Sequence, residues 1–124
     1  MGVTQGCSQG FWGNLNNVEH WLPTGFLPTD SFNTVFDRNV FNATFTLIQA
    51  VNLQGGNLNA LARQTVAALL NAAHPNINFP LTVDQVIEMF QTAFDSGVYG
   101  PTIELFEALN EAFCPLRGGP SPDC

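Results

Sequence analysis

The most extended helical pattern in the chain covers residues 58–73, which read LNALARQTVAALLNAA. Leucine, valine and alanine recur there every three or four positions, which is the spacing of one face of a helix. Only a narrow polar strip remains, formed by Asn59, Arg63 and Asn71. A helix that is apolar around nearly its whole circumference is usually buried on several sides. We therefore predict that residues 58–73 form the central helix of an all-α domain.

Three further segments carry helical patterns with start or stop signals. Residues 30–37 follow a capping pair and have apolar residues at helical spacing. Thr82 and Gln85 form a capping box ahead of an amphipathic pattern that ends at Gly97. A proline at the first helical position begins the last helix, which continues to about residue 113.

Residues 40–53 allow two interpretations. The first half alternates between apolar and polar residues, as in a strand. Over the whole length, however, Phe41, Phe45, Ile48 and Val51 step by threes and fours, as in a helix that ends at the following glycine pair. We favour the helix because fourteen residues are long for a strand, and the strand remains open.

Residues 1–28 contain glycines, prolines, repeated asparagines and both tryptophans, with little periodicity. We predict an irregular aromatic arm laid over the helical body at residues 29–116, with one helical turn at residues 17–21. Large aromatic side chains without a regular element of their own usually fill gaps in a core. The whole forms one domain over residues 1–116, a bundle of four to five helices, followed by a linker-like tail at residues 117–124. The expected anchors of the arm are Phe11, Trp12, Trp21, Leu22, Phe26 and Leu27.

Three cysteines lie near the ends of the chain: Cys7, Cys114 and Cys124. A bond between Cys7 and Cys114 would tie the two ends of the folded region together. Closing a loop of about 100 residues stabilises a fold by about 4–5 kcal/mol in the chain-entropy model. Such a bond requires an oxidising compartment. The alternative is three unrelated thiols, and in either case Cys124 is left over, free or paired with another chain.

The charge of the chain limits its partners. Three arginines and no lysine stand against ten acidic residues, for a net charge of −7. This balance disfavours binding to nucleic acid and to anionic lipid. Charged residues make up only 10%, well below the roughly 25% of ordinary soluble domains. We expect an extracellular or self-associating protein, with no membrane-spanning segment and with no leader visible at the start of this chain.

Few residues are candidates for chemistry. A metal-dependent hydrolase would need His20, His74 and a carboxylate to converge, since metal-binding spacings such as HExxH are absent from the sequence. The row of glutamates at 104, 107 and 111 has the spacing of a solvated helix face. Asn42 begins an Asn-Ala-Thr tripeptide, a sequon for N-linked glycosylation. We expect no cofactor.

The two ends and the central helix resemble a known group of domains. The matching stretches are residues 7–12 (CSQGFW), Trp21, residues 61–73, and residues 109–116 with their Cys-Pro-Leu. They are similar to a helical domain of secreted and cell-surface proteins, mainly microbial, to which no enzymatic activity is attached. The resemblance implies location more than mechanism. The chain departs from the pattern at Gly13, where lysine is common, so no role of that lysine carries over.

Three hypotheses about function follow. The first is a non-enzymatic extracellular module that acts by contact with itself or other surface proteins, and that could assemble into a fibre or surface layer. Its interface candidates are Phe11, Trp12, Trp21 and Cys124. The second is a carrier of a small apolar ligand, since eleven phenylalanines could line a cavity. The third, which we rank last, is the metal-dependent hydrolase.

Overall fold

A computed structural model describes residues 3–117 of the chain. Within these residues the regular structure is helical, and two isolated bridges, Gly6 with Phe113 and Ser31 with Thr46, stand outside any strand. The all-α fold is therefore confirmed. The helices are α1 (Gln9–Gly13), the 3-10 helix η1 (Leu15–Thr24), α2 (Phe32–Phe36), α3 (Leu47–Val51), α4 (Leu58–Ala73), α5 (Val83–Ser96), α6 (Gly100–Asn110) and the 3-10 helix η2 (Pro115–Arg117).

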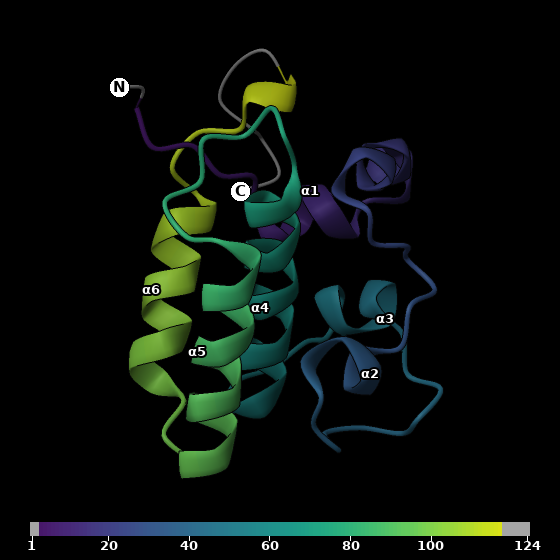
Figure 1. Ribbon diagram of the computed structural model, residues 1–124, viewed down its shortest axis with the longest axis vertical. Coiled ribbons are helices and arrows are strands. Elements are labelled where there is room, and N and C mark those ends of the chain that lie inside the picture. Colours follow the sequence, from purple (N-terminus) through teal and green to yellow (C-terminus); the bar gives the residue numbers. More distant parts are fainter. Residues whose placement is uncertain (1–2, 118–124) are drawn as a thin grey trace.

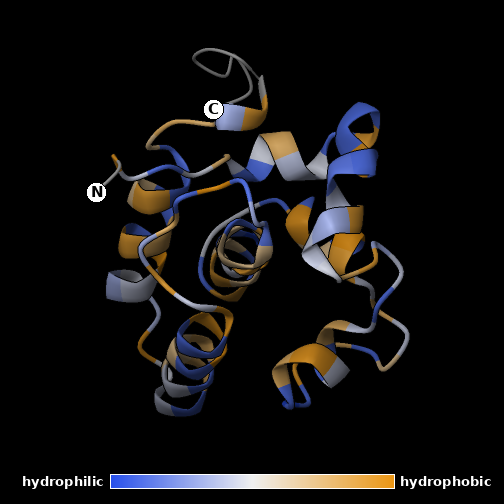
Figure 2. Ribbon diagram, turned by 45° about the horizontal axis from the view of Figure 1, so that its top comes forward, coloured by the Kyte–Doolittle hydropathy of each residue, from blue (hydrophilic) through white to orange (hydrophobic). Residues whose placement is uncertain are grey.

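Helix α4 lies at the centre of the molecule, as predicted. Helices α5 and α6 pack on one side of it, and α1, η1 and α3 pack on the other (Figures 1 and 2). From Ala60 to Asn71 every residue of α4 except Arg63 is buried. The predicted polar strip of Asn59, Arg63 and Asn71 is therefore not a solvent-exposed face of the helix. Arg63 donates to the carbonyls of Leu53 and Gly55, whereas Asn71 is in the core.

The phenylalanines pack against one another. Phe32 and Phe36 of α2 lie 4.6 Å apart, measured between ring centroids, and both rings contact Phe90 of α5 at 5.4 and 5.0 Å. Phe41 and Phe45 make a further pair at 4.7 Å. Aromatic pairs at these separations are attractive beyond the area they bury. These contacts join α2 to α5, and the Phe41 ring, 5.2 Å from that of Phe32, joins the α2–α3 connection to α2.

The limits of the later helices follow their caps. The Thr82–Gln85 capping box is present, and Gly97 ends α5 in the left-handed region at φ 76°. Helix α6 ends at Asn110, three residues before the predicted limit. Beyond it the chain turns back so that the Phe113 carbonyl accepts a hydrogen bond from Gly6 N–H at 2.8 Å. A Cβ at position 6 would collide with the Leu109 carbonyl oxygen, so this approach requires glycine.

The N-terminal arm is more regular than predicted. Residues 9–13 form α1, whose cap Ser8 accepts a hydrogen bond from Phe11 N–H, and ten residues form η1. The predicted turn at residues 17–21 lies within η1, and the five residues of α1 make too few turns for an apolar period to be visible in the sequence. Of the expected anchors, Leu22 and Leu27 are wrong, because they are 75% and 49% exposed.

The segment at residues 40–53 forms neither a full helix nor a strand. Only Leu47–Val51 is helical, and it begins at a Thr46–Gln49 capping box. The part before it is held irregular because the Asn33 side chain accepts hydrogen bonds from the backbone N–H groups of Val40 and Phe41 at 2.9 and 3.0 Å. Because these N–H groups already donate to a side chain, they are not available for the backbone hydrogen bonds of a helix or a sheet.

Candidate functional site

The two ends of the described chain meet beside α4. Cys7 and Cys114 form a disulfide with a Cα–Cα distance of 4.4 Å, across 107 positions of sequence. Both residues are buried. The predicted bond between the ends is thus present, whereas Cys124 lies outside the described residues. None of the helices in residues 3–117 is long and apolar enough to cross a membrane.

Asn71 joins the N-terminal segment to α4 beside this disulfide. Its Oδ1 accepts hydrogen bonds from Cys7 N–H at 2.8 Å and from the Trp12 indole N–H at 3.1 Å. Its Nδ2 donates to the Cys7 carbonyl at 2.8 Å and to Asn110 Oδ1 at 2.9 Å. Asn110 Nδ2 in turn donates to the backbone and side-chain oxygens of Gln64 at 3.1 and 3.0 Å. We call these three amides, Gln64, Asn71 and Asn110, the amide network.

The aromatic interface candidates belong to the core. Phe11 and Trp12 have no exposed surface, and Trp21 is 1% exposed. The Trp12 and Trp21 rings meet edge to face at 6.4 Å, and the Trp21 indole donates to the Trp12 carbonyl at 3.2 Å. Their side chains therefore position η1 and α1 and offer a partner no contact surface in this structure.

The outer side of η1 carries an apolar strip that we define as Leu15, Val18 and Leu22. These side chains are 73%, 41% and 75% exposed. Val18 lies one 3-10 turn after Leu15, and Leu22 follows about one turn later. The buried Trp21 fixes η1 from behind. Sequence reasoning missed this strip because it chose the large aromatic residues nearby as the contact residues. The only sign of the strip in the sequence is the apolar character of these three residues.

The two histidines approach each other without forming a metal site. His74 is 3% exposed, and its Nδ1 accepts a hydrogen bond from Asn76 N–H at 3.1 Å. Burial lowers the pKa of His74 below its usual value, and the neighbouring charge of His20 lowers this pKa further. Residues 3–117 hold no group of three or more His, Cys, Asp or Glu side chains that could bind a metal ion.

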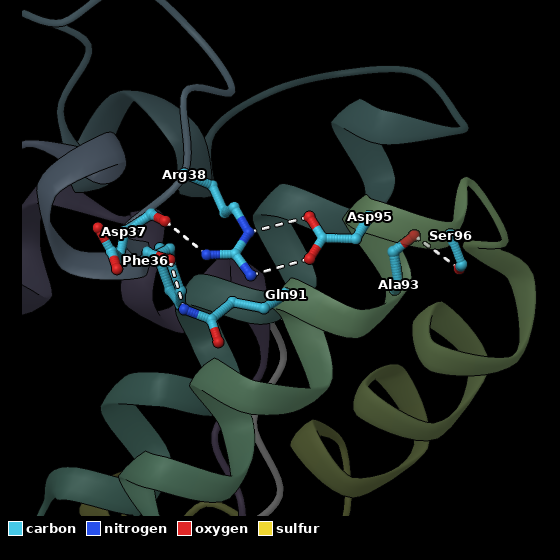
Figure 3. Close-up of polar contacts among 7 residues, drawn as sticks. All are labelled: Phe36, Asp37, Arg38, Gln91, Ala93, Asp95 and Ser96. Atoms are coloured by element: carbon cyan, nitrogen blue, oxygen red, sulfur yellow. Dashed lines mark hydrogen bonds and ion pairs between the residues drawn. The ribbon is translucent and has the colours of Figure 1, made fainter.

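A shallow hollow lies beside the contact of α2 with α5. Figure 3 shows Arg38 forming two hydrogen bonds to the Asp95 carboxylate, at 2.9 and 2.8 Å, and a third to the Asp37 carbonyl. The Arg38 guanidinium holds the pKa of the Asp95 carboxyl below its usual range. The hollow, of about 450 Å³, is lined by Asn33, Thr34, Asp37, Arg38 and Asn39.

This lining is polar, so it does not suit the apolar ligand of the carrier hypothesis. The phenylalanines that were expected to line a cavity instead include Phe32, Phe36 and Phe90, which are fully buried and in ring contact. Glu104 and Glu107 are exposed on α6, and Glu111, which is also exposed, directly follows this helix. Asn42 is exposed in the α2–α3 connection.

The chain was compared with protein families, curated proteins and solved structures. No family model, curated protein or solved structure matches the chain.

Proposed function

We propose that this chain is a non-enzymatic extracellular module that works by contact, assembling with copies of itself or with other surface proteins. The observation that carries the proposal is the η1 strip. Two leucines that are each about three-quarters exposed, beside a half-exposed valine, stand on a helix anchored by a buried tryptophan. Apolar side chains held on a rigid base lose little conformational freedom when a partner covers them.

Three further features support an extracellular location and a role in contact. The buried Cys7–Cys114 disulfide is typical of proteins that fold in an oxidising compartment. Only 10% of the residues are charged, so a partner that covers this surface removes fewer charged side chains from water than on an ordinary domain. The resemblance of the chain ends to domains of secreted and surface proteins points the same way.

The strip can supply a useful part of an association energy. Fully burying a leucine contributes about 1.5–3 kcal/mol. With about three-quarters of each leucine exposed, covering Leu15 and Leu22 would contribute roughly 2–4 kcal/mol on one partner. A two-fold pair would use the same surface on both copies.

Two charge-matched variants test the proposal. Leu22→Glu places a carboxylate in the strip, and Val98→Glu places one on a 61% exposed apolar residue at the α5–α6 turn. Sedimentation velocity over a wide concentration range should show association of the parent chain, loss in Leu22→Glu and retention in Val98→Glu. A parent chain that stays monomeric at every concentration would exclude self-assembly, and equal effects of both variants would remove the strip as the interface.

A further inference from the structure

The α2–α3 connection contains the one Asn-X-Ser/Thr tripeptide of the chain, Asn42-Ala43-Thr44. All three residues are exposed, and they lie in a turn between α2 and α3. Sequons that carry a glycan in secreted proteins occupy such surface loops, because a buried asparagine has no room for a sugar.

The Asn42 side chain is held in one orientation. Its Oδ1 accepts two hydrogen bonds at 2.9 Å, one from the backbone N–H of Thr44 and one from the Thr44 hydroxyl. The Asn42 carbonyl accepts a third from Phe45 N–H, also at 2.9 Å. This is an Asx-turn closed by a second turn. All the hydrogen bonds at the Asn42 side chain use Oδ1, so Nδ2 stays unengaged by residues 3–117.

Hydrogen bonds from neighbouring residues hold the turn at Asn42 in place, and none of them involves Asn42 Nδ2. Asn33 Nδ2 donates to the Phe41 carbonyl at 2.7 Å, and the Ser31 hydroxyl donates to the Ala43 carbonyl at 3.1 Å. On the inner side, Phe32 N–H donates to the Phe45 carbonyl at 2.9 Å. The turn therefore presents the Asn42 amide on a supported base, so a bulky group at Nδ2 would not disturb the core.

From this geometry we propose that Asn42 is the acceptor of an N-linked oligosaccharide. The donor is a lipid-diphosphate-linked oligosaccharide of a secretory pathway, and the inference rests on the extracellular route of the proposed function. In the transfer, Nδ2 forms a bond to the anomeric carbon of the first sugar. The bond from that carbon to the phosphate oxygen breaks, the diphosphate leaves with the electron pair, and the proton from Nδ2 passes to a base of the transferase.

The glycan would leave the η1 strip uncovered. In Figure 1 the α2–α3 connection and η1 lie at opposite ends of the layer that faces α4. A sugar at Asn42 is attached to this connection and not to η1, which carries the strip. Glycosylation and association through η1 are then independent, and each can be measured without the other.

The experiment secretes the full chain behind a heterologous leader from eukaryotic cells and compares intact mass before and after peptide-N-glycosidase. The parent chain and Thr44→Ser should lose the mass of one glycan, and conversion of Asn42 to aspartate should appear in the peptide map. Asn42→Gln and Thr44→Ala should show no such loss. Val18→Thr completes a second Asn-X-Thr tripeptide at the exposed Asn16, so it should lose the mass of two glycans.

An unmodified Asn42 in a secreted chain, with the added site at Asn16 occupied in Val18→Thr, would overturn the proposal. The same samples separate the two inferences. A parent chain that is glycosylated at Asn42 and monomeric at all concentrations would support the glycan and exclude self-assembly. If η1 is the interface, the glycan at Asn16 should also abolish association, whereas the glycan at Asn42 should not.

Discussion

Replacing Asn71 with alanine should cost more stability than any other single asparagine change in α4. Asn71 has no exposed surface, and its side chain makes four hydrogen bonds to the N-terminal segment and to α6. Asn71→Ala leaves at least three buried polar atoms without their partner: Cys7 N–H, the Trp12 indole N–H and Asn110 Oδ1. A buried group stripped of its partner costs about 1–3 kcal/mol.

The expected loss is therefore roughly 3–9 kcal/mol, against a total stability of about 5–15 kcal/mol for an ordinary domain. Asn59→Ala is the matched control on the same helix. Its side chain makes a single hydrogen bond, to the Gln54 carbonyl in a solvent-accessible loop, so water can replace it. We expect Asn59→Ala to cost less than about 1 kcal/mol.

Urea unfolding of the oxidised proteins, followed by far-ultraviolet circular dichroism, measures both free energies, provided that the m-values agree. Tryptophan emission reports the combined environment of the two buried indoles, Trp12 and Trp21, at the same time. Equal losses for Asn71→Ala and Asn59→Ala would refute the reasoning, because they would mean that water satisfies the abandoned groups. A double-mutant cycle with Asn110→Ala should give a coupling energy of about 1 kcal/mol or more, since the two amides are in direct contact.

Two further predictions concern the disulfide and His74. Removing the Cys7–Cys114 bond with paired Cys→Ala changes should lower the free energy of unfolding by about 4–5 kcal/mol. Alkylation of the parent chain without reductant should label at most one of its three cysteines. Three labelled cysteines would refute the bond. Burial lowers the pKa of His74 in the folded chain, so the unfolded chain binds a proton below about pH 6.5 and the folded chain binds it only at lower pH. The free energy of unfolding should therefore fall as the pH drops from about 6.5 to the pKa of the folded chain, and it should level off below that pKa. His74→Gln should flatten this slope in unfolding curves measured between pH 7.5 and 5, and an unchanged slope would show that His74 is not its source.

The long helices could be predicted from the sequence because their signals are local. The limits of α4 agree with its apolar pattern, and the α5 capping box needs only two residues three positions apart. Helix α1 was missed because it has only five residues, and of η1 only the turn at residues 17–21 was predicted. Both elements are held by contacts with side chains outside themselves. The Trp12 indole of α1, for example, donates to Asn71, 59 positions further along the chain, and no window of sequence contains that pairing.

The surface was harder to predict than the core. Aromatic residues are common in interfaces, which favoured Trp12 and Trp21 as contact residues. Both are buried, and the apolar side chains left outside are the smaller ones next to them. In an arm without clear periodicity the sequence cannot say which side of the chain faces inward. The disulfide, by contrast, was predictable because Cys7 comes before the first predicted helix and Cys114 just after the last one.

The amide network explains how a helix as uniform as α4 can specify one arrangement of its neighbours. Leucine and alanine pack against many apolar surfaces, so α6 or the N-terminal segment could shift along α4 with little loss of apolar contact. Such a shift would separate Gln64 from Asn110, and Asn71 from Cys7, and would leave buried amides without partners. A half-satisfied polar network is less stable than a fully apolar core, so the shifted arrangements are disfavoured. The Cys7–Cys114 bond closes the same junction covalently, so it helps to hold α1, and with it η1 and its strip, against α4.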